Sequence, residues 1–251
     1  MNKIQKSITN KIEDIAKSNK NDRFASAIKS TVGELPFVGS YIADIITDKI
    51  PNQKLDRVIA YLGKLTERLN ELPKENIEEL IASPKFQALL EETIEQSAKA
   101  TTQERYEYLA SIVVNGISDE KVAVEESEYI LSLFKQLTDV QIIWLNYYCL
   151  KRYGNSNEYF EKHKNILKKK EVYLKASFED ITQVALQRGN TEHLIRLGLI
   201  REENDYDRKT EQLKIDSSTK KLKVTDTVIT DLGKVVLSHI GIFEDYNKSA
   251  N

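Results

Sequence analysis

Apolar residues recur every three or four positions through the first half of the chain, the spacing that is typical of amphipathic helices. Residues 4–15 and, more regularly, residues 55–72 each place their apolar side chains on one helical face. Ser83–Pro84 and Thr101–Thr102 are start signals for two further helices, and Asn115–Gly116 is a stop signal. The pattern therefore predicts a bundle of several helices in this half.

The densest apolar and aromatic region covers residues 127–153 and includes Trp144 and Cys149, each the only residue of its type. Its second half is apolar nearly all round, and a helix without a polar face has to be buried. We expect this region to form one continuous rod on which the preceding helices and the following segment both pack.

The pattern changes after residues 154–157, which are Gly-Asn-Ser-Asn and mark a loop. We predict a domain boundary here, with a helical domain over residues 1–153 and a second domain over residues 154–251. In the second domain, residues 178–186 read as a helix and Gly189–Asn190 as a turn. A second helix follows and ends at Gly198.

Alternating apolar residues then predict two strands, at residues 213–215 and 222–229, with a turn over residues 216–219. Thr230–Asp231 begins a last helix. Helix, turn, helix and two-stranded ribbon is the order of a winged helix-turn-helix. The predicted fold is thus mainly α, an N-terminal multi-helix bundle followed by a C-terminal winged-helix-like domain with a β-hairpin.

Charge is unevenly distributed along the 251 residues, although the net charge is only -2. Residues 70–130 hold fourteen acidic and five basic side chains, whereas residues 151–175 hold eight basic and three acidic ones. Such asymmetry affects association with partners and not the fold. We interpret the acidic excess as a solvated helix face, because no loop there has the spacing of a calcium site.

The single cysteine excludes an intramolecular disulfide and fits a reducing compartment. The first residues lack the apolar run of a signal peptide, and no stretch is apolar for the length of a membrane span. We therefore expect a cytoplasmic protein, with membrane association left open as an alternative.

A Gly-Pro-Gly series interrupts an apolar segment near the N-terminus and predicts a tight helical hairpin. Its residues are also the candidate segment for contact with a membrane or a partner: Gly33, Pro36, Phe37, Gly39 and Tyr41. One interpretation is a packed core hairpin, and the other is a membrane-active segment. Absence of both liposome leakage and membrane association would exclude the second interpretation.

Two short sequence motifs in the last quarter of the chain resemble those of a known family. They are Leu-Gly-Leu-Ile at residues 197–200 and Ile-Thr-x-Leu-Gly at residues 229–233. Together they are similar to the C-terminal part of bacterial Abi-alpha-like abortive-infection proteins. The resemblance implies a role in phage defence, and it supplies no catalytic residue.

Enzymatic motifs are missing from the sequence. His163, His193 and His239 are scattered and form no zinc-type pair, and there is no phosphate-binding glycine loop or serine elbow, so we expect no metal and no cofactor. One spacing, Arg188 and His193, resembles the Arg-x4–6-His motif of the helical HEPN ribonucleases. An arginine and a histidine at one phosphate could stabilise charge and transfer a proton. Equal RNA cleavage by wild type and His193→Ala would exclude this hypothesis.

Three hypotheses of function result. The first is a non-enzymatic defence effector whose helical half acts on a partner or membrane and whose winged helix serves docking or dimerisation. The second is a DNA-binding regulator that inserts residues 191–197 into the major groove. The third is the ribonuclease. Candidate nucleic-acid contacts are Arg188, His193 and Arg196 on the helix, with Lys220, Lys221 and Lys223 on the wing. The first is preferred because that helix carries few bases.

Overall fold

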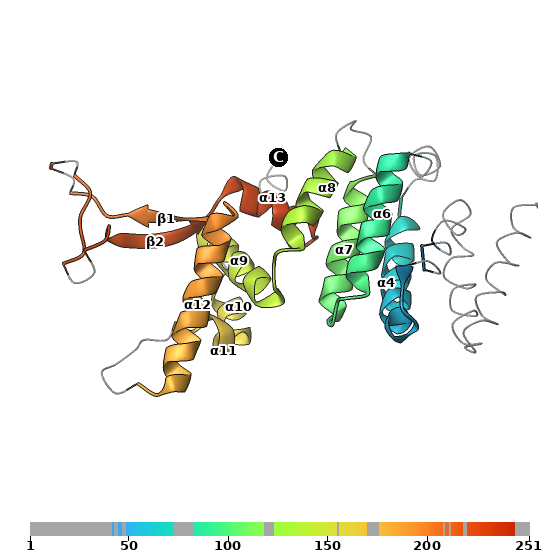
Figure 1. Cartoon of the computed structure of the whole chain (residues 1–251). Coiled ribbons are helices and arrows are strands. Elements are labelled where there is room, and N and C mark those ends of the chain that lie inside the picture. The colour runs from blue at the N-terminus through green and yellow to red at the C-terminus, as the bar shows by residue number, and fades with distance from the viewer. Residues whose placement is uncertain are drawn as a thin grey trace, which may run out of the picture. The chain divides into compact units, whose positions relative to one another are not determined.

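The computed structural model describes residues 42, 45, 46, 49–72, 83–117, 123–154, 156–169, 176–207, 209, 210, 212–217 and 220–243. Helices dominate these residues, and two short strands near the C-terminus form an antiparallel ribbon (Figure 1). The predicted mainly helical class with a C-terminal hairpin is therefore confirmed. The chain divides into an N-terminal unit, within Met1–Lys135 and His239–Gly241, and a C-terminal unit, within Gln136–Ser238 and Ile242–Asn251.

The described residues of the N-terminal unit include four long helices. A short 3-10 helix, Asn52–Lys54, leads into α4, Leu55–Leu69. The others are α6 (Pro84–Ser97), α7 (Gln103–Asn115) and α8 (Ala123–Phe134). α4 packs on α6 and α7, and both of these pack on α8. The apolar stripe predicted from residue 55 onward faces this interior, where Val58, Leu62 and Leu65 are almost completely buried.

Helix starts in this unit follow the predicted signals. Ser83 caps α6, because its hydroxyl accepts a hydrogen bond from the Phe86 amide at 3.2 Å, and Pro84 occupies the first helical position. Thr102 and Gly116 flank α7 as its caps. Propensity and capping therefore agree with the packing of the bundle.

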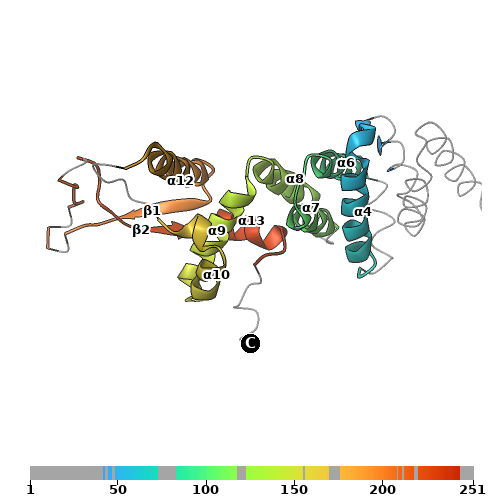
Figure 2. The ribbon, with the colours of Figure 1, turned by 90° about the horizontal axis from the view of Figure 1, so that it is seen from below.

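The C-terminal unit packs helices against the ribbon. It contains α9 (Asp139–Arg152), α10 (Ser156–Lys162), α11 (Lys164–Leu167), α12 (Phe178–Arg196) and α13 (Asp231–His239, up to Ser238 in this unit). Strand β1, Ile200–Asn204, pairs with β2, Val224–Ile229, from Ile200 opposite Ile229 to Asn204 opposite Val224. α12 contacts β1 and α9 contacts β2, so the base of the ribbon lies between two helices (Figure 2).

The expected continuous rod over residues 127–153 is wrong. The structure ends α8 at Phe134 and begins α9 at Asp139, and the two helices belong to different units. Thr138 explains the break: its hydroxyl accepts from the Gln141 amide, and the Gln141 side chain accepts from the Thr138 amide. The burial of Trp144 is confirmed, since its side chain is 3% exposed.

The predicted turn at Gly189–Asn190 is also wrong, because α12 runs through both residues without a break. A glycine in a helix costs about 1 kcal/mol relative to alanine, which the tertiary contacts of the helix offset. Ser177 and Asp180 form a capping box at its start, and Leu194 near its end is fully buried. Gly198 closes the helix in a left-handed conformation with φ +72, as expected.

The first strand lies earlier than predicted, at Ile200–Asn204 instead of residues 213–215, whereas the second falls inside its predicted range. Ile215 bridges to Leu222 on the two sides of the predicted turn over residues 216–219, of which residues 218 and 219 lie outside the described part of the chain. The units divide after Lys135, while the sequence suggested a boundary after residue 153. The difference arises because α9 packs on α12 and β2.

Candidate functional site

The far end of the ribbon, residues 205–223, is the segment we call the ribbon tip. Three stretches of backbone meet in it. The Lys214 amide donates to the Asp205 carbonyl at 2.9 Å, the Asp205 amide to the Lys223 carbonyl at 2.7 Å, and the Lys223 amide to the Lys214 carbonyl at 2.9 Å. These bonds connect Asp205, Lys214 and Lys223 where the tip adjoins the two strands.

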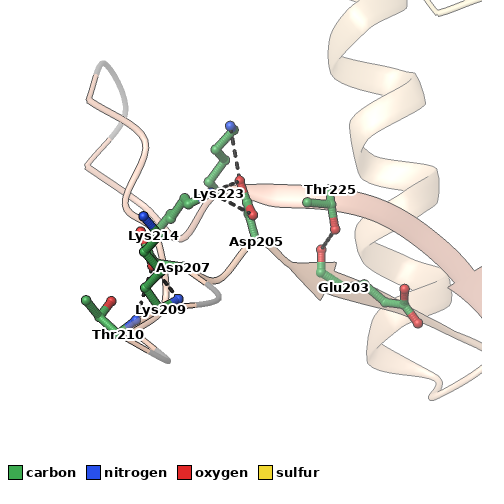
Figure 3. Close-up of polar contacts among 8 residues, drawn as sticks. All are labelled: Glu203, Asp205, Asp207, Lys209, Thr210, Lys214, Lys223 and Thr225. Atoms are coloured by element: carbon green, nitrogen blue, oxygen red, sulfur yellow. Dashed lines mark hydrogen bonds and ion pairs between the residues drawn. The ribbon is translucent and has the colours of Figure 1, made fainter.

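Side chains reinforce the same junction (Figure 3). The Asp205 carboxylate lies 3.2 Å from the ammonium groups of both Lys214 and Lys223. Hydrogen bonds from these two lysines lower the pKa of Asp205. Asp207 accepts the backbone amides of Lys209 and Thr210 at 2.8 and 3.1 Å, which lowers the pKa of Asp207. Both aspartates therefore stabilise the conformation of the residues that they contact in the tip.

Large apolar side chains are exposed at the ribbon tip and just beyond it. Exposure ranges from 40% to 64% for the five residues concerned, which are Tyr206, Leu213, Ile215, Leu222 and Val224. Two isolated bridges, Tyr206 with Leu213 and Ile215 with Leu222, set four of them opposite one another. Exposed apolar clusters of this kind mark interaction sites more often than scattered single residues do.

A second exposed apolar site lies at the start of α12. Phe178 is 85% exposed and Ile181 is 46% exposed. Glu179 and Asp180 occupy the same first turn, and residues 177–186 contain no basic side chain. This α12 start, defined as residues 177–181, therefore combines an apolar with an acidic character.

The candidate nucleic-acid contacts on α12 are not gathered at one point. Arg188 forms an ion pair with Glu192 at 2.7 Å, and Arg196 is exposed in the last turn. His193 lies five positions after Arg188, so the two point about 140° apart around a continuous helix. The arrangement expected of a ribonuclease pair is thus not present at these residues.

His193 connects two helices instead. Its Nδ1 lies 2.8 Å from the side-chain nitrogen of Gln141 on α9. The Gln141 side-chain oxygen already accepts from the Thr138 amide, so the amide nitrogen donates and the ring nitrogen accepts. This contact gives His193 a structural role between α9 and α12.

Lys220, Lys221 and Lys223, which we expected on a wing, lie at the ribbon tip. Lys223 is engaged with Asp205, Lys220 has a φ of 57 in the turn, and Lys221 is exposed. Lys209 is also exposed there. The tip is therefore basic as well as apolar, with five lysines and three aspartates among its described residues.

Other candidate chemistry finds little support among the described residues. Burial raises the pKa of the Cys149 thiol to about 11, so this cysteine is unreactive at neutral pH. Within the described ranges, no group of three metal-ligating side chains comes together, and no helix has the length and apolar character to cross a membrane. The segment with Gly33, Pro36, Phe37, Gly39 and Tyr41 lies outside the described residues.

The sequence analysis did not identify Phe178, Ile181 and Tyr206 as exposed residues: it placed the first two in a helix and assigned Tyr206 to no element. Comparisons with protein-family models, with curated proteins and with solved structures return no significant match to this chain.

Proposed function

We propose that this protein is a non-enzymatic effector or interaction protein of the bacterial abortive-infection type. In this proposal the C-terminal unit is a winged-helix-like module through which two copies of the chain associate. The defence role rests on the resemblance of residues 197–200 and 229–233 to Abi-alpha-like proteins. The association rests on one observation, the exposed apolar side chains at the ribbon tip and the α12 start.

The order of elements supports a winged-helix-like module. Three helical segments, α9, α10–α11 and α12, precede the ribbon, and α13 follows it. In a winged helix, the helix before the ribbon is the recognition element. Here that helix is α12, which packs on β1 while α9 packs on β2. Because α12 is continuous, the turn expected at Gly189–Asn190 is absent, but the order of the helices and the ribbon is unchanged.

A second copy of the chain is the partner that suits these surfaces best. The ribbon tip is apolar with an excess of lysine, and the α12 start is apolar with Glu179 and Asp180. In a two-fold dimer, the tip of each copy would contact the α12 start of the other, because such an interface pairs unlike patches reciprocally. Apolar burial would supply affinity, and the opposite charges would fix the orientation.

Sedimentation velocity across the micromolar range tests the association. We expect wild type to dimerise and Ile215→Asp or Phe178→Asp to weaken dimerisation at least about tenfold, which is about 1.4 kcal/mol. Phe178→Asp keeps the helix start intact, since an acid in the first turn is favourable. Val235→Asp is the matched control, because Val235 is 43% exposed on α13 and is expected to leave dimerisation unchanged.

Exchanging the charges of two residues tests more specifically whether the ribbon tip contacts the α12 start. Glu179→Lys and Lys220→Glu are each expected to weaken the dimer, and the double variant is expected to recover it. A wild-type protein that stays monomeric at every concentration would contradict the proposal. So would a double variant weaker than both single variants.

Lys209, Lys220 and Lys221 also favour a second candidate, contact of the ribbon tip with nucleic-acid phosphate. α12 limits this function, since its first half has two acids and no base. We expect sequence-independent DNA binding with a dissociation constant no tighter than about 10⁻⁶ M at physiological salt. Electrophoretic mobility shifts with two unrelated duplexes measure it. A clear preference for one sequence, lost in Arg196→Ala, would make DNA recognition the leading function.

A further inference from the structure

The ribbon tip separates its charged side chains by burial. Its three described aspartates are half-buried, whereas its five described lysines are all exposed: Lys209, Lys214, Lys220, Lys221 and Lys223. Asp205 is engaged with two of these lysines, and Asp207 accepts backbone amides of the tip. The tip therefore presents a more positive charge to its surroundings than the count of five bases and three acids indicates.

The exposed apolar side chains of the tip lie next to one another. The two bridges set Tyr206 opposite Leu213 and Ile215 opposite Leu222, and directly opposite side chains of antiparallel stretches are neighbours. Leu213 and Ile215 are two positions apart in the stretch that makes both bridges, so they lie on the same side of it. These four side chains, which are 45% to 64% exposed, form one apolar surface.

An apolar surface with exposed lysines around it has the chemistry that an anionic membrane surface binds. Proteins that lie in this interface place apolar side chains at the acyl boundary and lysines among the headgroups. Each lysine near an anionic surface adds to the attraction, and tyrosine is favoured at the headgroup level. A nucleic acid would engage the lysines but would leave Leu213, Ile215 and Leu222 in water.

We propose that the ribbon tip inserts shallowly into the surface of an anionic bilayer. Tyr206, Leu213, Ile215 and Leu222 enter the interface, and the lysines contact lipid phosphates. All of these side chains are exposed in a single chain, so lipid binding does not rest on the proposed self-association. Since both contacts use the tip, a bilayer and a second copy of the chain compete for it.

Vesicle co-sedimentation of the full-length protein measures the lipid contact. The vesicles are phosphatidylcholine with or without phosphatidylglycerol, and we expect binding at least about tenfold weaker without the anionic lipid. Ile215→Asp and Lys220→Glu are each expected to weaken binding to anionic vesicles at least about tenfold. Val235→Asp, which adds the same charge at an exposed apolar position on α13, is expected to leave binding unchanged.

A tryptophan placed at the tip locates the contact on the molecule. Trp144 is 3% exposed and supplies a constant background. We expect brominated lipid in the anionic vesicles to quench the added fluorescence of Tyr206→Trp. Tyr129→Trp is the matched control, because Tyr129 is 53% exposed on α8 and Tyr206 is 55% exposed, and this variant is expected to remain unquenched.

Phe178→Asp separates lipid binding from self-association, because Phe178 lies outside the tip. This variant is expected to bind anionic vesicles at least as tightly as wild type. Wild type that does not bind anionic vesicles, or that dimerises without binding them, would overturn the proposal. Ile215→Asp that binds as wild type does, or equal quenching of the two tryptophan variants, would overturn it as well. Tighter binding of wild type to duplex DNA than to anionic vesicles would assign the tip to nucleic acid instead.

Discussion

Gly233→Ala is expected to destabilise the C-terminal unit by about 3 kcal/mol or more, in the range reserved for severe core changes. A Cβ atom at this position would lie 2.2 Å from the carbonyl oxygen of Leu199 and 2.8 Å from a side-chain carbon of Ile229. The obstacle is a backbone atom, so no rotamer change relieves the clash. Urea unfolding followed by the fluorescence of Trp144 measures the loss in this unit.

Thr230 explains why the backbone cannot retreat from Gly233. Its amide donates to the Leu199 carbonyl at 3.0 Å, and its hydroxyl lies 2.6 Å from the Gly198 carbonyl. The same hydroxyl accepts from the Gly233 amide at 3.1 Å. The end of α12, the start of β1 and the start of α13 are therefore joined around one threonine.

Gly189→Ala is the matched control for Gly233→Ala. Gly189 lies in the interior of α12, and a Cβ there would meet no atom within 4 Å. Alanine is the better helix former, so this variant is expected to stabilise the unit by about 1 kcal/mol. A Gly233→Ala protein as stable as wild type would show that residues 197–200 and 229–233 are not in contact in solution.

Tyr61→Phe is expected to destabilise the N-terminal unit by about 1–2 kcal/mol at neutral pH. Tyr61 is completely buried on α4, and its hydroxyl donates to the Thr93 hydroxyl on α6 at 2.8 Å. Thr93 in turn donates to the Leu90 carbonyl at 2.9 Å, so the variant leaves no buried donor without an acceptor. Denaturation followed by circular dichroism measures the helices of this unit.

We expect alkaline pH to remove the stability difference between wild type and Tyr61→Phe. Burial raises the pKa of Tyr61 far above its ordinary value of 10.0. Above pH 10 the unfolded chain ionises at this residue while the folded chain does not, so wild type loses about 1.4 kcal/mol per pH unit relative to Tyr61→Phe. The contribution of Tyr61 is therefore fully present below pH 10 and is lost as the pH rises above it.

Tyr129→Phe serves as the control for both measurements on Tyr61. Its ring is 53% exposed on α8, so the substitution is expected to change neither the neutral stability nor its dependence on pH. If wild type and Tyr61→Phe lost stability in parallel between about pH 8 and about pH 11, the hydroxyl would not be buried in solution.

Local signals in the sequence were sufficient for most helices. Ser83, Thr102 and Thr230 stand at helix starts, and the apolar spacing from Leu55 onward gives the buried face of α4. Thr138 and Gln141 carry an equally readable capping box, and overlooking it produced the expectation of one rod. Residues 127–153 are apolar as predicted, but they are divided between two helices.

The errors concerned features that depend on tertiary contacts. Gly189–Asn190 has the composition of a turn, yet packing of α12 on α9 and β1 overrides that preference. His193 met Gln141, a partner 52 positions away, which no local pattern reveals.

The contacts around Thr230 distinguish residues that the fold requires from residues that it leaves free to vary. Residues 197–200 and 229–233 fit together through backbone atoms and a glycine, while the described residues of the ribbon tip between them contribute no large side chain to the core of their unit. Its length and composition are therefore under little constraint from folding. A lineage could exchange one tip for another and acquire a different binding preference on an unchanged scaffold.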